Sequence, residues 1–98
     1  MEKRTPHRRL SELKALVKAG RVRTTHAARA GASELGLDFA GMLSVVMALK
    51  ASDFYKSMTT HADHSIWQDV YRPRTAAAAV YLKLTVVDDL LIISFKEL

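Results

Sequence analysis

The sequence VYLKLTVVDDLLIISFK, residues 80–96, decides the fold. Apolar and polar side chains alternate on either side of Asp88 and Asp89, a pattern typical of two antiparallel strands joined by a two-residue turn. Such a turn would place Leu82 opposite Phe95 and Tyr81 opposite Lys96. One face of the hairpin is then apolar, with Val80, Leu82, Leu84, Val86, Leu91, Ile93 and Phe95. The other face is polar, with Tyr81, Lys83, Thr85, Ser94 and Lys96.

Two more strands are predicted just upstream, at residues 54–60 and 66–72. The predicted connections are short, at residues 61–65, 73–79 and 88–89. Short connections favour antiparallel neighbours. Pro73 lacks a backbone N–H, so we expect it at a strand end or edge. The second half of the chain is therefore predicted to form an antiparallel meander of four strands.

The first half of the chain has the apolar spacing of helices. The first predicted helix begins at Thr5 and Pro6 and ends at Gly20. The second predicted helix follows Thr24 or Thr25 and ends at Gly31 or the turn at residues 34–36. The third begins at Asp38. A short strand at residues 21–24 separates the first two. The third helix carries an apolar stripe of Phe39, Met42, Leu43, Val46 and Leu49. The expected fold is α+β, a twisted and mainly antiparallel sheet covered on one face by about three helices.

Composition limits the possible classes of protein. The 98 residues suffice for one domain, which we expect to span residues 1–98, and 49% of them are hydrophobic. Without cysteine the chain has neither disulfides nor thiolate metal sites. No apolar run has the length of a signal peptide or a membrane span, so a soluble cytoplasmic protein without a membrane partner is expected.

Positive charge is concentrated in the first half of the chain. The formal net charge is +5, and nine of the fifteen basic residues precede residue 30. A field of this kind favours a polyanion such as nucleic acid. A basic helix face that is simply solvated remains the alternative.

Several kinds of active site are absent from the sequence. There is no glycine-rich phosphate loop, no GxSxG nucleophile motif and no HExxH zinc motif. His61, Asp63 and His64 lie in a polar loop where solvated side chains are expected, and His7 and His26 are interpreted as surface residues or RNA contacts. No metal or cofactor is expected.

The remaining polar groups of the sheet suit RNA cleavage. In that reaction the 2′-hydroxyl is the nucleophile, so the protein has to move protons, orient the phosphate and neutralise its oxygens. Lysine among other cations and tyrosine beside lysine are expected to have lowered pKa values. Exposed lysines and tyrosines are also common on sheets, so the alternation of side chains alone does not establish catalysis.

Five long strings carry a resemblance to a known family. They are MEKRTPH at 1–7, ELGLDF at 34–39, SDFYKSMTT at 52–60, IWQDVYRPR at 66–74 and YLKLTV at 81–86. With them the chain resembles the MqsR family, the motility quorum-sensing regulator toxins, over nearly its whole length. The resemblance implies a RelE-like fold and a ribosome-independent mRNA interferase that prefers GCU and related sites. It also implies a cognate antitoxin of the MqsA type, which binds zinc through one domain and operator DNA through another.

The resemblance also implies site residues. The catalytic positions of the family fall on Lys56, Gln68 and Tyr81, and neighbouring positions expected to touch RNA fall on Tyr55, Met58, Arg72 and Lys96. We assign proton transfer to Tyr81, a cationic or basic role to Lys56 and an orienting role to Gln68. The alternative functions are a non-catalytic nucleic-acid binder and an inactive relic that still pairs with an antitoxin.

Overall fold

The computed structural model describes all residues, Met1–Leu98. Its elements in chain order are β1 (Glu2–Lys3), α1 (Leu10–Lys18), β2 (Val22–Thr24), α2 (His26–Glu34), α3 (Phe39–Met47), a 3-10 turn (Ala51–Asp53), β3 (Phe54–Thr59), β4 (Trp67–Tyr71), β5 (Val80–Val87) and β6 (Asp89–Glu97). One sheet contains all six strands in the order β1-β3-β4-β5-β6-β2. Only β2 runs parallel to its neighbour.

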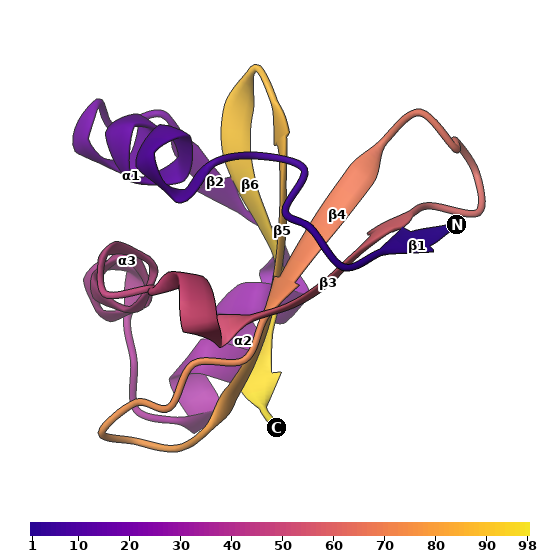
Figure 1. The fold of residues 1–98 in the computed structure, drawn as a ribbon. Helices are drawn as coiled ribbons and strands as arrows, with labels where there is room; N and C mark the ends of the chain where they lie inside the picture. Colours follow the sequence, from indigo (N-terminus) through magenta and orange to yellow (C-terminus); the bar gives the residue numbers. More distant parts are fainter.

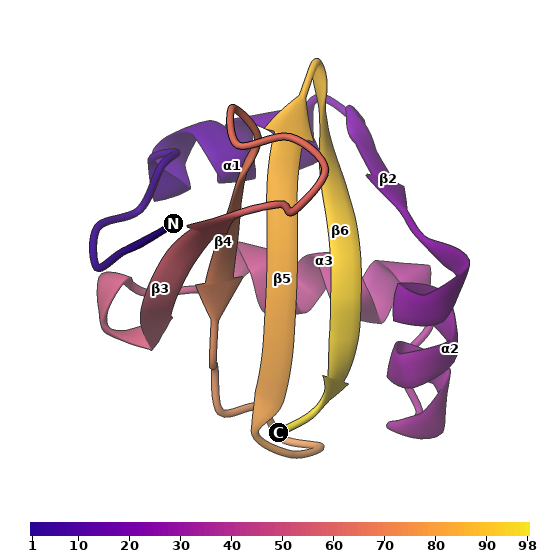
Figure 2. The ribbon, with the colours of Figure 1, turned by 90° about the vertical axis from the view of Figure 1, so that its right-hand side faces the viewer.

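Helices α1 and α3 lie on one side of this sheet (Figure 1). Turning the molecule by 90° brings the strands to the front, with α1 and α3 behind them and α2 beside the β6 edge (Figure 2). The predicted α+β fold and the meander from β3 to β6 are confirmed. The arrangement is also compatible with a RelE-like fold. No single helix could span a membrane by length and hydropathy, although α2 and α3 pass that test as a pair bent by 89°.

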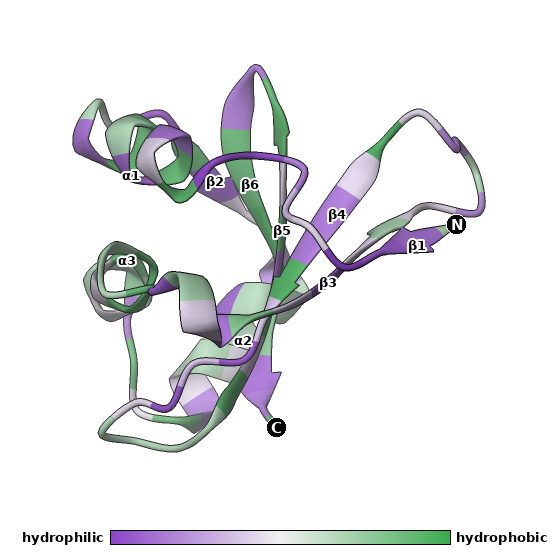
Figure 3. Cartoon of the chain, viewed as in Figure 1, coloured by the Kyte–Doolittle hydropathy of each residue, from purple (hydrophilic) through white to green (hydrophobic).

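One hydrophobic core joins the helices to the sheet. Leu13 of α1, Met42 and Val46 of α3, and Leu82 and Ile92 of the central hairpin are fully buried in the same cluster. Figure 3 shows the same division by hydropathy, with an apolar α3 facing apolar strands and a hydrophilic segment before α1. The face of the sheet turned away from α1 and α3 is called the open face below.

The central hairpin has the two predicted residue pairs, but its turn differs from the prediction. Leu82 pairs with Phe95 and Tyr81 with Lys96, as expected. At the turn, however, Val87 pairs with Asp89, and Asp88 alone forms the tip with φ 66°. A register shift opposite Lys83 and Leu84 then restores the predicted pairs.

This tighter turn changes which side chains of β6 are buried. Leu91 and Ile93 were predicted to face the core, and that prediction is wrong. Leu90 and Ile92 are fully buried in their place. The tighter turn shifts the pairing by one residue, which reverses the side of the sheet to which each side chain of β6 points. Ile93 is the extra residue of the bulge and reverses the sides again, so Phe95 faces the core as predicted.

The predicted helix start at Thr5 and Pro6 is also wrong. Helix α1 begins at Leu10 with Arg9 as its N-cap. Both carboxylate oxygens of Asp69 in β4 accept bonds from the His7 backbone N–H, at 3.0 and 3.1 Å, and one accepts a bond from the Arg8 N–H at 3.1 Å. These long-range bonds fix the backbone of His7 and Arg8 outside the helix.

Other local predictions are confirmed. Val22–Thr24 is a strand, and Thr25 and Asp38 cap the next two helices through bonds from the Ala28 and Gly41 backbone N–H groups. Helix α2 does not end at Gly31 but continues to Glu34, and Gly31 lets it approach β6 closely. A Cβ at Gly31 would lie 1.9 Å from the Phe95 carbonyl oxygen.

We expect Gly31→Ala to destabilise the protein by roughly 1–3 kcal/mol, because the added methyl group meets backbone and β6 has to move. This figure is net of the gain of about 1 kcal/mol that alanine brings to a helix interior. Urea unfolding followed by circular dichroism measures the difference. Gly41→Ala is the matched control, because its added Cβ meets the flexible Leu37 side chain first, at 3.1 Å. Equal stability of Gly31→Ala and the native chain would contradict the packing described for α2.

Candidate functional site

A bulge in β3 determines the direction of Lys56. Phe54 pairs with Tyr71 and Lys56 pairs with Val70, so Tyr55 is an extra residue between two regular pairs. Without the bulge, Phe54 and Lys56 would share a face. With it, Phe54 packs against the core and its ring meets Tyr71 at 5.5 Å, while Lys56 turns to the open face.

The register brings the three predicted catalytic residues to the same face. Val70 pairs with Lys56 on one side and Lys83 on the other. Gln68 precedes Val70 by two positions and Tyr81 precedes Lys83 by two, so all of these side chains share the open face. This face is turned toward the viewer in Figure 2, across β3, β4 and β5. Val70 is fully buried yet lies outside the core cluster, which gives the group an apolar floor.

The predicted RNA contacts join the group from both sides. Met58 pairs with Gln68, and Lys96 pairs with Tyr81, with its Nζ 5.3 Å from the centroid of the phenol ring. These two pairs extend the open-face group along β3 and onto β6.

Three cationic side chains lie close to the ring of Tyr55 in β3. The Arg72 guanidinium lies 3.8 Å from the centroid of the Tyr55 ring, and the Arg4 guanidinium lies 5.8 Å from it. Lys56 Nζ is 5.4 Å from the same centroid. Arg4 was not predicted as a site residue, because nothing in the local pattern connects residue 4 with the bulge.

Lys56 forms an ion pair that the sequence did not reveal. Its Nζ donates to Glu2 Oε2 at 2.8 Å, and its side chain is 20% exposed. The hydrogen bond to Glu2 raises the pKa of Lys56, to which the charges of Glu2, Tyr55 and Tyr81 add. The same pair lowers the pKa of Glu2. The expected lowering of the lysine pKa is therefore wrong for Lys56, because the Glu2 carboxylate raises this pKa more than burial lowers it; Lys56 is a cation at neutral pH.

The helix-covered face of β4 has a separate polar group. Asp69 is 2% exposed and binds the N-terminal segment as described above. The Tyr71 hydroxyl is buried without a hydrogen-bond partner. Burial, assisted by the charge of Asp69, raises the pKa of Tyr71 to about 12. Tyr71 therefore stays protonated at neutral pH and has no access to a substrate on the open face.

The histidines contribute little to the open-face group. His7 stacks on Trp67 with ring centroids 5.6 Å apart, its Nδ1 lies 3.0 Å from Lys3 Nζ, and burial is the main cause of its lowered pKa. Asp63 accepts bonds from Ser65 within its own loop. No cluster of three or more histidine, aspartate or glutamate side chains has an arrangement that could hold a metal ion.

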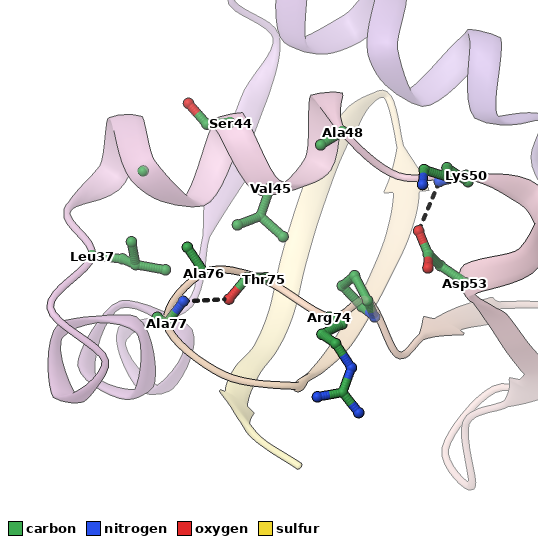
Figure 4. Close-up of a pocket in the computed structure, with 12 residues that line it drawn as sticks. Leu37, Ser44, Val45, Ala48, Lys50, Asp53, Arg74, Thr75, Ala76 and Ala77 are labelled. Carbon is green, nitrogen blue, oxygen red and sulfur yellow. Dashed lines mark hydrogen bonds between the residues drawn. The ribbon is translucent and has the colours of Figure 1, made fainter.

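The molecule has one cavity, which lies away from the open-face group. It has a volume of about 570 Å³ and is formed by α3 and the loop after β4, including Val45, Lys50, Arg74 and Ala76. Figure 4 shows Val45, Leu37 and Ala76 around this space and the Arg74 guanidinium directed away from it. None of the seven predicted site residues lines it. The open-face group is therefore a surface site built on strands and not a closed pocket.

Comparison with known proteins agrees with the resemblance seen in the sequence. The mRNA interferase toxin MqsR of Escherichia coli (strain K12) is 66% identical over 97 residues, which cover 99% of each chain. Residues 5–97 match the family described as motility quorum-sensing regulator, toxin of MqsA. The chain belongs to this MqsR toxin family.

Proposed function

We propose that residues 1–98 form a single mRNA interferase domain, a toxin that cleaves messenger RNA on the open face of its sheet. The observation that carries this proposal is the placement of Lys56, Gln68 and Tyr81, from three adjacent strands, on one face. The 66% identical relative is named an mRNA interferase toxin, which supports the same activity.

The chemistry follows from the groups on this face. The 2′-hydroxyl gives up its proton as its oxygen attacks phosphorus, the bond from phosphorus to the 5′-oxygen breaks, the 5′-oxygen takes up a proton, and a 2′,3′-cyclic phosphate remains. The Tyr81 hydroxyl transfers a proton in this exchange, the Lys56 ammonium stabilises the charge on the phosphate oxygens, and the Gln68 amide orients the phosphate. None of these three roles requires a metal ion or cofactor.

RNA binding is assigned to four residues around the catalytic group. Tyr55, Met58, Arg72 and Lys96 offer an aromatic ring, an apolar side chain and two cations, a combination suited to single-stranded RNA. The preferred sequence is GCU or a related triplet, which the family resemblance supports.

The proposed protein partner is an antitoxin. The family description names MqsA, and an antitoxin of that type would bind zinc and DNA and neutralise the toxin. The proposed location of both proteins is the cytoplasm, where messenger RNA is the substrate, and no membrane partner is proposed.

We expect Tyr81→Phe to lower the rate of RNA cleavage by about 10²- to 10⁴-fold, the usual contribution of a proton-transfer group. The assay uses a long RNA with several GCU sites in EDTA and maps the cuts by primer extension. Tyr71→Phe is the matched control, because it removes a phenol oxygen that has no hydrogen-bond partner and lies on the other face. Its activity and fold should match those of the native chain.

Two results would contradict the proposal. Intact RNA after incubation with the folded native protein would rule out the nuclease and favour a non-catalytic binder or antitoxin-pairing relic. Equal rates for Tyr81→Phe and the native chain would remove Tyr81 from the reaction.

Substitution of Lys56 separates a cationic from a basic role. We expect Lys56→Ala to lose about 10²- to 10³-fold in rate and Lys56→Arg to retain more activity, because arginine keeps the positive charge. The raised pKa of Lys56 keeps it protonated below its ordinary value of 10.5. Its charge should therefore be constant between about pH 6 and 9, and the pH–rate profile should show no ionisation of Lys56 in that range. A Lys56→Arg rate as low as that of Lys56→Ala, with a Lys56-dependent rise toward alkaline pH, would indicate a base.

A further inference from the structure

Glu2 brings a carboxylate to the cations of the open face. Strand β1 pairs with the outer edge of β3, and Glu2 lies opposite Met58, which faces the open side. Its Oε2 lies 2.8 Å from Lys56 Nζ, and the Lys56 side chain has no other hydrogen-bond partner. Lys56, Lys83 and Lys96 share this face, and Arg72 lies against the Tyr55 ring next to Lys56. Glu2 therefore introduces an anion where a polyanionic substrate has to bind.

A carboxylate oxygen and a phosphate oxygen make the same contact with an ammonium group. Both accept short charge-assisted hydrogen bonds of about 2.7–2.9 Å. In the free protein, Glu2 therefore occupies the position at Lys56 that a phosphate oxygen of RNA would take. The carboxylate also orients the flexible Lys56 side chain toward β1, at the edge of the sheet.

The ion pair between Glu2 and Lys56 is suited to exchange with a phosphate. Glu2 is 55% exposed, and its side chain has Lys56 as its hydrogen-bond partner. Strand β1 has only two residues and is fixed nearby by bonds between Met1 and Thr59: the Thr59 N–H donates to the Met1 carbonyl at 3.0 Å, and the Met1 amino group donates to Thr59 Oγ1 at 3.1 Å. An exposed ion pair of this kind contributes little to stability, so a phosphate can displace the carboxylate at small cost.

We propose that Glu2 is a positioning residue for Lys56, which holds the lysine ammonium in the free protein and yields it to a phosphate of the RNA. The proposal rests on the proposed function, because it assumes that Lys56 binds RNA. It makes Glu2 a determinant of RNA affinity: the carboxylate competes with the substrate for one cation.

The test is RNA affinity after the substitution Glu2→Gln. The probe is a GCU-containing oligoribonucleotide with 2′-deoxyribose at the cleaved position, which cannot be cut because the nucleophile is missing. At about 50 mM salt we expect Glu2→Gln to bind it roughly threefold to fivefold more tightly than the native chain. Glu34→Gln is the matched control, because Glu34 is exposed at the end of α2 and its loss changes the net charge equally.

A double-mutant cycle shows whether Glu2 acts through Lys56. In a Lys56→Ala chain, Glu2→Gln should leave the affinity unchanged within error, because the contested cation is absent. The proposal is overturned if Glu2→Gln weakens or does not alter binding, if Glu34→Gln tightens binding equally, or if the gain persists without Lys56.

Cleavage of the corresponding all-ribose RNA is measured in parallel. If the native chain binds RNA without cutting it, the proposed nuclease fails while the binding cycle still decides the role of Glu2. Absence of RNA binding by the native chain would overturn both.

Discussion

The site on the open face depends on one irregularity of the backbone, the extra residue Tyr55 in β3. Side chains alternate along a strand, so a single extra residue exchanges the faces of everything beyond it. Phe54 is thereby packed against the core and Lys56 is placed on the open face, where the Glu2 carboxylate pairs with its charge. The register of β4 and β5 then places Gln68 and Tyr81 on the same face as Lys56. The bulge thus serves both the packing of the core and the chemistry of the open face.

A second constraint ties the N-terminal segment to this group. Strand β4 has polar residues directed to both faces, with Gln68 on the open face and Asp69 beneath the helices. The buried Asp69 carboxylate accepts backbone N–H bonds from His7 and Arg8, which satisfies the charge and fixes the entry to α1. The segment before His7 then lies along β3, where Glu2 reaches Lys56 and Arg4 approaches Tyr55.

The parts predictable from sequence were those governed by local pattern. The alternation of apolar and polar residues predicted the face of Tyr81 and its pairing with Lys96. Capping residues such as Thr25 and Asp38 predicted two helix starts. The bulges were not predictable, because an extra residue leaves no distinct local signal. Leu91 and Ile93 were therefore misplaced, and the alternation around Lys56 and Gln68 could not separate the two faces. The helix start at Pro6 failed for another reason: the bonds that the His7 and Arg8 N–H groups donate to Asp69 join residues more than sixty positions apart.

The most direct test of the account is an NMR titration of the isotope-labelled protein with a GCU-containing RNA that lacks the 2′-hydroxyl at the cleaved position. Bound RNA should shift the signals of the open face, above all those of Lys56, Gln68 and Tyr81, in one saturable process. The signals of Val45 and Ala76, which line the cavity beside α3, should stay in place. Shifts confined to that cavity or to the basic surface of α1, with the open face unchanged, would contradict the central claim that the sheet itself forms the RNA site.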